Sequence, residues 1–205
     1  MRGRPPLSLI FGRMKSGKSF HAKRMARKAP GRVWIWDPNK EWAGPDSVDG
    51  IPGCWPATNW DHCLRILLAQ GDPAPRIAFQ VGADKFPEWC DLVRYCGNML
   101  AIVDEAHETM GPRKLPPQAM SLVRRTRHSR VDLVLVAQRP TAIDVNVRSQ
   151  AHGVVTFQMS EALDLDWIGG HCGPDIKRRV PDLAQGEFVE WVAGAHMRRK
   201  KGKQG

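Results

Sequence analysis

The sequence lacks the features that mark a membrane protein or a disulfide-stabilised domain. No stretch approaches the roughly 18 continuous apolar residues of a membrane span, and no apolar segment with a small-residue cleavage site follows the basic start. We therefore expect neither a membrane span nor a signal peptide. The cysteines, five in number, are widely spaced and include no CxxC pair. We therefore expect neither a disulfide scaffold nor a zinc ribbon. We expect instead that the thiols are reduced, in a cytoplasm.

Acidic residues are scarce relative to basic ones. Lysine and arginine total 31 against 21 acids, a formal net charge of +10, which favours a polyanionic partner and nucleic acid first. Part of the excess lies at the ends, in Arg2, Arg4 and the closing "RRKKGKQG". We interpret the chain as a basic leader (1–6), one domain (7–197) and a basic tail (198–205). The ends act either as loose electrostatic tethers or only as solubilising segments.

Short apolar runs rich in Val, Ile and Leu alternate with helical patterns. The expected strands are 7–11, 32–36, 76–81, 99–103, 131–137, 153–158 and 186–192, and the expected helices are 17–28, 59–69, 86–96 and 117–127. Continuous apolar strands separated by helices predict an α/β fold with a mainly parallel central sheet flanked by helices. The Gly- and Pro-rich stretch 41–56 is expected to be irregular.

The stretch "GRMKSGKS" (12–19) matches the phosphate-loop pattern G-x-x-x-x-G-K-[ST] between an expected strand and an expected helix. Its glycines allow backbone N–H groups to point at phosphate oxygens, and the helix N-terminus adds positive charge. Lys18 would reach the β- and γ-phosphates of ATP, and Ser19 would bind Mg²⁺. The residues predicted to bind the nucleotide are Gly12, Arg13, Met14, Lys15, Ser16, Gly17, Lys18, Ser19 and Phe20.

Polar residues follow two of the buried strands. Asp104 and Glu105 end "MLAIV", where the first carboxylate would help to hold Mg²⁺ and the second would act as the general base toward the attacking water. Gln138 follows the strand 131–137. Because ligands bind at the carboxyl edge of parallel strands, Gln138 is placed to contact the γ-phosphate or the water.

These segments together resemble the HerA/FtsK superfamily of P-loop DNA-pumping ATPases. The resemblance is carried by "GRMKSGKS", "LAIVDEAHE", "WDPNKEW" (36–42) and above all the Arg-rich lead-in to "VLVAQRP". It implies a RecA-like P-loop NTPase fold. Asp37 and Glu41 match acids that the family keeps near the nucleotide, and they are candidates for outer contacts.

Within the superfamily, the compact chain is most similar to the genome-packaging ATPases of membrane-containing icosahedral viruses. That resemblance implies a ring, expected to be a hexamer, that pulls double-stranded DNA into a procapsid in the host cytoplasm, with capsid or portal-vertex proteins as further partners. It also implies an arginine inserted from the neighbouring subunit. Arg127 aligns best with this role, and its competitors are Arg124, Arg125, Arg130 and Arg148.

Two other functions and several side chains stay open at this stage. A thymidine-kinase-like nucleoside kinase fits the two motifs but normally carries a CxxC lasso, and a phage assembly NTPase would bind nucleotide without moving DNA. Trp42 and Trp55 are either core residues or base-stacking residues in loops. His107 and His128 either contact phosphate or a neighbouring subunit, or make only local hydrogen bonds.

Overall fold

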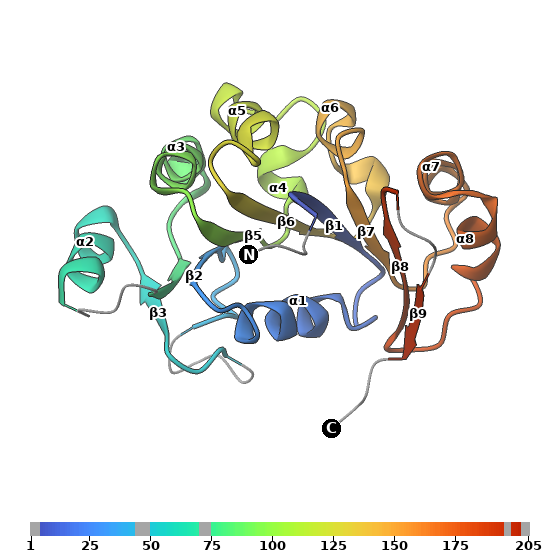
Figure 1. The fold of residues 1–205 in the computed structure, drawn as a ribbon, viewed down its shortest axis with the longest axis horizontal. Helices are drawn as coiled ribbons and strands as arrows, with labels where there is room; N and C mark the ends of the chain where they lie inside the picture. Colours follow the sequence, from blue (N-terminus) through green and yellow to red (C-terminus); the bar gives the residue numbers. More distant parts are fainter. Residues whose placement is uncertain (1–4, 44–49, 70–74, 195–197, 202–205) are drawn as a thin grey trace.

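The protein, described here from a computed structural model, is built on one sheet with helices on both faces (Figure 1). The structure describes residues 5–43, 50–69, 75–194 and 198–201, the last four without their side chains. Much of the expected leader and tail (residues 1–4 and 202–205) and part of the stretch expected to be irregular (44–49) lie outside the described residues. No helix in the described part of the chain is long and apolar enough to cross a membrane.

Within the described residues, the sheet has nine strands in the order β3-β4-β2-β5-β6-β1-β7-β8-β9. The strands are β1 (Leu7–Phe11), β2 (Arg32–Trp36), β3 (Cys54–Ala57), β4 (Arg76–Phe79), β5 (Met99–Val103), β6 (Val131–Ala137), β7 (Gly153–Thr156), β8 (Glu187–Val192) and β9 (Arg198–Lys201). The first seven pair in parallel, and β8 and β9 join antiparallel. The predicted mainly parallel α/β fold is therefore confirmed.

Helices cover both faces of the sheet (Figure 1). They are α1 (Lys18–Arg27), α2 (Trp60–Ala69), α3 (Phe86–Cys96), α4 (His107–Met110), α5 (Pro117–Arg125), α6 (Val145–Arg148), α7 (Ala162–Cys172) and α8 (Pro174–Arg179), with 3₁₀ turns η1 (Ala83–Lys85) and η2 (Pro140–Ala142). Helix α1 lies alone on one face near the centre, and α3, α5 and α6 lie on the other. Two buried clusters, one on each face, form the core.

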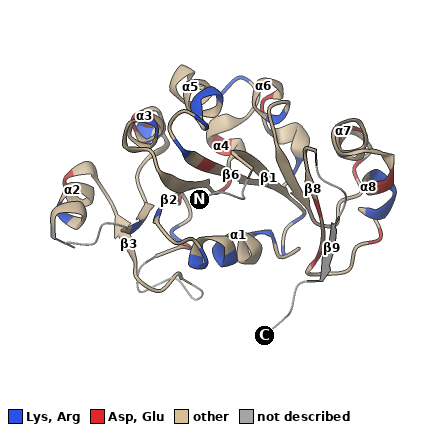
Figure 2. Ribbon diagram, viewed as in Figure 1, with Lys and Arg blue, Asp and Glu red and all other residues tan. Residues whose placement is uncertain are grey.

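Local sequence explains most of these elements. Strands β1 and β5 are buried at every position, as continuous apolar runs in a central parallel sheet should be. Helix α5 begins at Pro117, whose fixed backbone angle and missing N–H suit the first helical position. Helix α1 turns Ala22 and Ala26 toward the sheet, and its basic residues are divided: Lys18 and Lys23 are buried, whereas Arg27 is exposed (Figure 2). These choices place the carboxyl ends of β1, β5 and β6 side by side.

Candidate nucleotide-binding site

The loop 12–19 joins the end of β1 to the start of α1, the position that a phosphate loop requires. Gly17 lies at the N-cap of α1 with φ 105°, a conformation that favours glycine, and no acidic residue occupies the first turn. A Cβ on Gly12 would lie 2.5 Å from Ser16 Oγ and 2.6 Å from Phe157 Cβ. The two invariant positions of the motif are therefore glycines for reasons of space and backbone angle, and the helix N-terminus is free to attract an anion.

Two polar side chains of this loop are buried. Ser16 is 4% exposed and Lys18 6% exposed, and Ser16 Oγ has no hydrogen-bond partner among the described residues. A buried hydroxyl without a partner is costly unless a ligand satisfies it. Its position in a loop of glycines and lysines fits the triphosphate of a nucleotide.

Hydrogen bonds join the loop to the segment that precedes β8 and to a residue that follows β7. The Gly186 N–H donates to Ser16 O at 3.2 Å, the Gln185 amide donates to Lys15 O at 3.4 Å, and the Arg13 N–H donates to Gln158 O at 3.4 Å. A cavity of about 290 Å³ opens at this junction, lined by Arg13, Met14, Lys15, Ser16, Gln158, Ala184 and Gln185. No local sequence pattern predicts that Gln158, Ala184 and Gln185 line this cavity, because they are distant from the loop in sequence and approach it only in the folded chain.

The structure brings Asp104, Glu105 and Gln138 to the same edge of the sheet as the loop. In the register of the sheet, Phe11 pairs with Ala137 and Val103 pairs with Leu135, so the three parallel strands end together. Asp104 is buried at the end of β5, and Gln138 is half-buried directly after β6, between the acidic pair and the loop. The sequence analysis placed these residues at the carboxyl ends of two strands, and they lie there in the structure.

Asp104 is held by hydrogen bonds on both carboxylate oxygens. Oδ2 accepts from the Trp42 indole N–H at 2.7 Å, and Oδ1 accepts from the Glu105 backbone N–H at 3.0 Å. Burial raises the pKa of Asp104 to about 6, although these two hydrogen bonds act in the opposite direction. A desolvated carboxylate gains from a nearby cation, and with the Ser19 hydroxyl it provides the oxygen donors that Mg²⁺ prefers.

Trp42 is a buried residue, fully enclosed, so the interpretation of this side chain as a base-stacking residue is wrong. The fully buried Asp37 accepts hydrogen bonds from the Glu41 N–H at 2.9 Å and the Trp42 N–H at 3.1 Å. The Gln80 amide donates to the same carboxylate at 2.9 Å. Asp37 therefore contacts the segment that approaches Asp104, and the exposed Glu41 contributes through its backbone.

Glu105 adopts a left-handed backbone angle, φ 43°. Its side chain is 17% exposed, and its Oε2 lies 3.3 Å from Nδ1 of His107 at the start of α4. Left-handed backbone in a residue other than glycine is strained and occurs most often at functional sites. The structure thus gives His107 a local partner, the residue predicted to be the general base.

The candidate arginines lie far from this site along the strands. Arg127 is exposed in the turn between α5 and β6, at the amino end of the strand that leads to Gln138. Arg124, Arg125 and Arg130 are exposed in the same region. Burial first and the charge of Arg127 second lower the pKa of His152. Arg148 is half-buried, with its guanidinium 5.9 Å from the ring centroid of Trp167.

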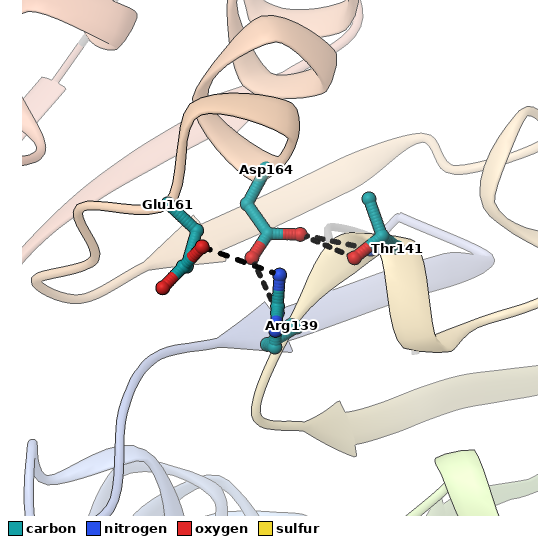
Figure 3. A network of polar contacts seen from close by, with 4 residues as sticks. All are labelled: Arg139, Thr141, Glu161 and Asp164. Carbon is teal, nitrogen blue, oxygen red and sulfur yellow. Dashed lines mark hydrogen bonds and ion pairs between the residues drawn. The ribbon is translucent and has the colours of Figure 1, made fainter.

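Sequence reasoning missed the role of Arg139, the residue directly after Gln138. Figure 3 shows its side chain beside Asp164, which is 1% exposed near the start of α7. The Arg139 Nε lies 2.8 Å from Asp164 Oδ2, and Glu161 lies 3.8 Å from the same guanidinium. The Thr141 hydroxyl and N–H both donate to Asp164, at 2.6 and 3.1 Å. The "QRP" stretch is therefore tied to α7 within its own chain.

Comparison with solved structures identifies proteins of the same fold. The genome-packaging NTPase B204 from Sulfolobus turreted icosahedral virus 2, in complex with AMP, matches with TM-score 0.74 and 21% identity, covering 99% of this chain and 100% of that one. VirB4 of Thermoanaerobacter pseudethanolicus matches with TM-score 0.59 and 13% identity, over 96% and 89% of the two chains. The N-terminal domain of zonular occludens toxin from Neisseria meningitidis gives 0.53 and 18%, over 94% and 86%.

Sequence comparison adds one partial match. The Zonular occludens toxin (Zot) family profile matches residues 74–166, which run from the start of β4 into α7. No curated protein sequence matches the chain. The resemblance to packaging ATPases seen in the sequence is confirmed at the level of the fold: the chain has the P-loop NTPase fold of a viral genome-packaging enzyme.

Proposed function

We propose that the protein hydrolyses ATP with Mg²⁺ and uses the reaction to move double-stranded DNA, as a viral genome-packaging ATPase. The observation that carries the proposal is the meeting of the phosphate loop, Asp104, Glu105 and Gln138 at one edge of the sheet. The end-to-end likeness to a genome-packaging NTPase, which has been solved with AMP and with ATP-gammaS, supports it.

The residues divide the chemistry as follows. Lys18 and the loop N–H groups bind the β- and γ-phosphates, and the adjacent cavity offers space for the nucleoside. Ser19 and Asp104 would hold Mg²⁺, which would supply positive charge against the phosphates when bound. Glu105 accepts the proton of the attacking water, while the amide of Gln138 can donate to a phosphate oxygen and accept from the water at once.

The proposal includes an oligomer and a place of action. The subunits form a ring, a hexamer in our proposal, around duplex DNA at the packaging vertex of a procapsid in the host cytoplasm. An arginine of the neighbouring subunit, with Arg127 as first candidate, completes each site. Its position in the turn before β6, at the opposite edge from its own phosphate loop, supports action on a neighbour rather than on the same subunit.

Steady-state ATP hydrolysis with and without duplex DNA tests the function. We expect Mg²⁺-dependent turnover that duplex DNA stimulates, its loss in Lys18→Ala, and retained ATP binding with almost no turnover in Glu105→Gln. Glu108→Gln, an exposed carboxylate on the adjacent helix, is the matched control and should keep wild-type turnover. Normal turnover in Glu105→Gln would contradict the assignment of the base.

The second candidate is a phage assembly NTPase that binds nucleotide without moving DNA. A translocation assay separates the two, because only a motor displaces a third strand from duplex DNA during ATP hydrolysis. The nucleoside-kinase alternative predicts that label from γ-labelled ATP appears on a deoxynucleoside rather than as free phosphate.

A further inference from the structure

One buried side chain stands between several charged residues at the edge of the site. Trp42 donates its indole N–H to Asp104 Oδ2 at 2.7 Å, and the Lys23 ammonium of α1 lies 5.8 Å from its ring centroid. Asp37, Asp104 and Lys23 are 0%, 3% and 7% exposed. Buried charges are retained only where partners satisfy them, and the indole contacts two of the three.

The hydrogen bond from Trp42 fixes one oxygen of Asp104 while the Glu105 N–H fixes the other. An ionised carboxylate offers about four acceptor positions, so two lone pairs remain for a cation or for its bound water. With both oxygens anchored by one bond each, the plane of the carboxylate and the direction of its free lone pairs are set. The bond from the Glu105 N–H depends only on the local backbone after β5. The bond from the indole depends on the tryptophan side chain at position 42.

The backbone that carries the indole is held in place by residues after two other strands. Asp37, following β2, receives the Glu41 and Trp42 N–H groups, and Gln80, following β4, donates to Asp37 at 2.9 Å and to Ala43 O at 3.0 Å. A polar chain therefore runs from the end of β4 through the end of β2 to Asp104 at the end of β5. These three strands are neighbours in the sheet.

We propose that Trp42 is a positioning residue that orients Asp104 toward the Mg²⁺ of a bound nucleotide, with Asp37 and Gln80 holding the backbone on either side of Trp42. The inference rests on the proposed function, since it assigns a role within that Mg²⁺–nucleotide site. Outer contacts of this kind tune cation affinity because they fix the direction of the ligand atom.

The hydrogen bond, and not aromatic bulk, distinguishes Trp42 from other buried tryptophans. Trp34 and Trp89 are equally enclosed, but their indole nitrogens have no hydrogen-bond partner among the described residues. Both pack in aromatic clusters, Trp34 against Phe79 and Trp89 against Phe86. Trp34 and Trp89 contribute aromatic packing alone, whereas Trp42 also donates a hydrogen bond to Asp104.

Calorimetry with ATPγS over a range of Mg²⁺ concentrations, using the full chain, tests the proposal. Trp42→Phe keeps the ring and removes the donor, so we expect the Mg²⁺ concentration for half-saturation to rise roughly 10-fold. Binding of ATPγS in EDTA should stay at the wild-type value. Trp34→Phe removes an indole nitrogen without a partner and should leave both measurements at wild-type values.

Two results would overturn the proposal: a wild-type Mg²⁺ dependence in Trp42→Phe, or an equal loss of ATPγS affinity with and without Mg²⁺. If Trp42→Phe fails to fold, Gln80→Met decides, because it leaves Trp42 in place and should shift the Mg²⁺ dependence in the same direction by a smaller factor. An unchanged Mg²⁺ dependence there overturns the proposal. Failure of the wild-type protein to bind ATPγS at all would instead refute the proposed function.

Discussion

The two edges of the central sheet are built in opposite ways. At the carboxyl edge, Asp104, Asp37 and Asp164 are buried, and each accepts at least two hydrogen bonds from its own chain. Near the amino edge, the last turn of α5 presents Arg124 and Arg125 to solvent, and the turn after it presents Arg127 and Arg130. Figure 2 shows this concentration of basic residues around α5.

The contrast distinguishes charged side chains that find their partners within the chain from those that are exposed to solvent. Buried carboxylates with fixed partners can shape a site before any ligand arrives, which reduces the reorganisation needed for chemistry. Exposed arginines have no such order, and their charge becomes useful only against a partner such as a phosphate group. The carboxyl edge thus acts within one subunit, and the amino edge is suited to act on another molecule.

The largest effect should come from removing Arg127, the arginine that we propose acts on a neighbouring subunit. Arg127→Ala is expected to lower ATP turnover by roughly 1,000-fold while ATP binding is retained, since an inserted arginine stabilises mainly the transition state. Mixing Arg127→Ala subunits with Lys18→Ala subunits should restore part of the turnover, because some interfaces then combine an intact loop with an intact arginine. Colorimetric phosphate release measures both.

Arg124→Ala tests a competing candidate in the same assay, because it removes an exposed arginine just before the same turn. It should leave turnover within about twofold of wild type. If the mixed subunits recover no turnover although they assemble together, Arg127 does not act across the interface. In that case the inference that the amino edge of the sheet acts on a neighbouring subunit is wrong.

An intermediate effect is expected from the Asp164 network. Asp164→Ala removes the acceptor of two Thr141 hydrogen bonds and should lower the free energy of unfolding by on the order of 2 kcal/mol. The half-exposed Arg139 adds little, because water can solvate it. Asp166→Ala, on the same helix as Asp164, breaks an exposed ion pair with Lys177 of α8 and should cost less than about 0.5 kcal/mol. Urea denaturation followed by circular dichroism distinguishes the two.

The smallest effect concerns His171, whose ring stacks on Trp167 and contacts Trp191. Burial lowers the pKa of His171, opposed by its hydrogen bond with Ala151 O. The pKa of His171 in the folded state lies below the unfolded value of about 6.5. At pH values between the two, the unfolded state therefore binds more protons than the folded state. Stability should therefore rise as the pH rises toward neutrality and fall on acidification below about 6.5.

The corresponding measurement compares urea unfolding of wild type and His171→Gln between pH 5 and pH 7. The variant should lose part of the acid-induced fall, and the difference between the two proteins removes contributions from Asp104 and His152. Parallel curves for the two proteins would show that His171 does not titrate differently in the folded and unfolded states.

Prediction from sequence worked where one local pattern decides one structural result. The phosphate loop, the buried strands β1, β5 and β6, and the proline at the start of α5 each follow from a short stretch. Parallel pairing then forces Asp104 and Gln138 to the same edge as the loop. The roles assigned to Lys18, Ser19, Glu105 and Arg127 remain predictions that the experiments above address.

Prediction failed where two distant stretches decide the result together. Trp42 and Asp104 are separated by 62 positions, and Arg139 and Asp164 by 25, so neither contact leaves a local pattern. Strand β3 was missed because "CWPA" contains a proline, which an edge strand tolerates and a central strand does not. Strand β9 was read as a basic tail because "RRKK" has no apolar alternation.

The backbone at Glu105 carries a further consequence. The Glu105 side chain is largely enclosed and contacts His107, so a glycine there would relax the left-handed angle of 43° but remove that contact. In the proposed function, the group that accepts the proton is therefore held by a backbone angle that costs the fold some stability.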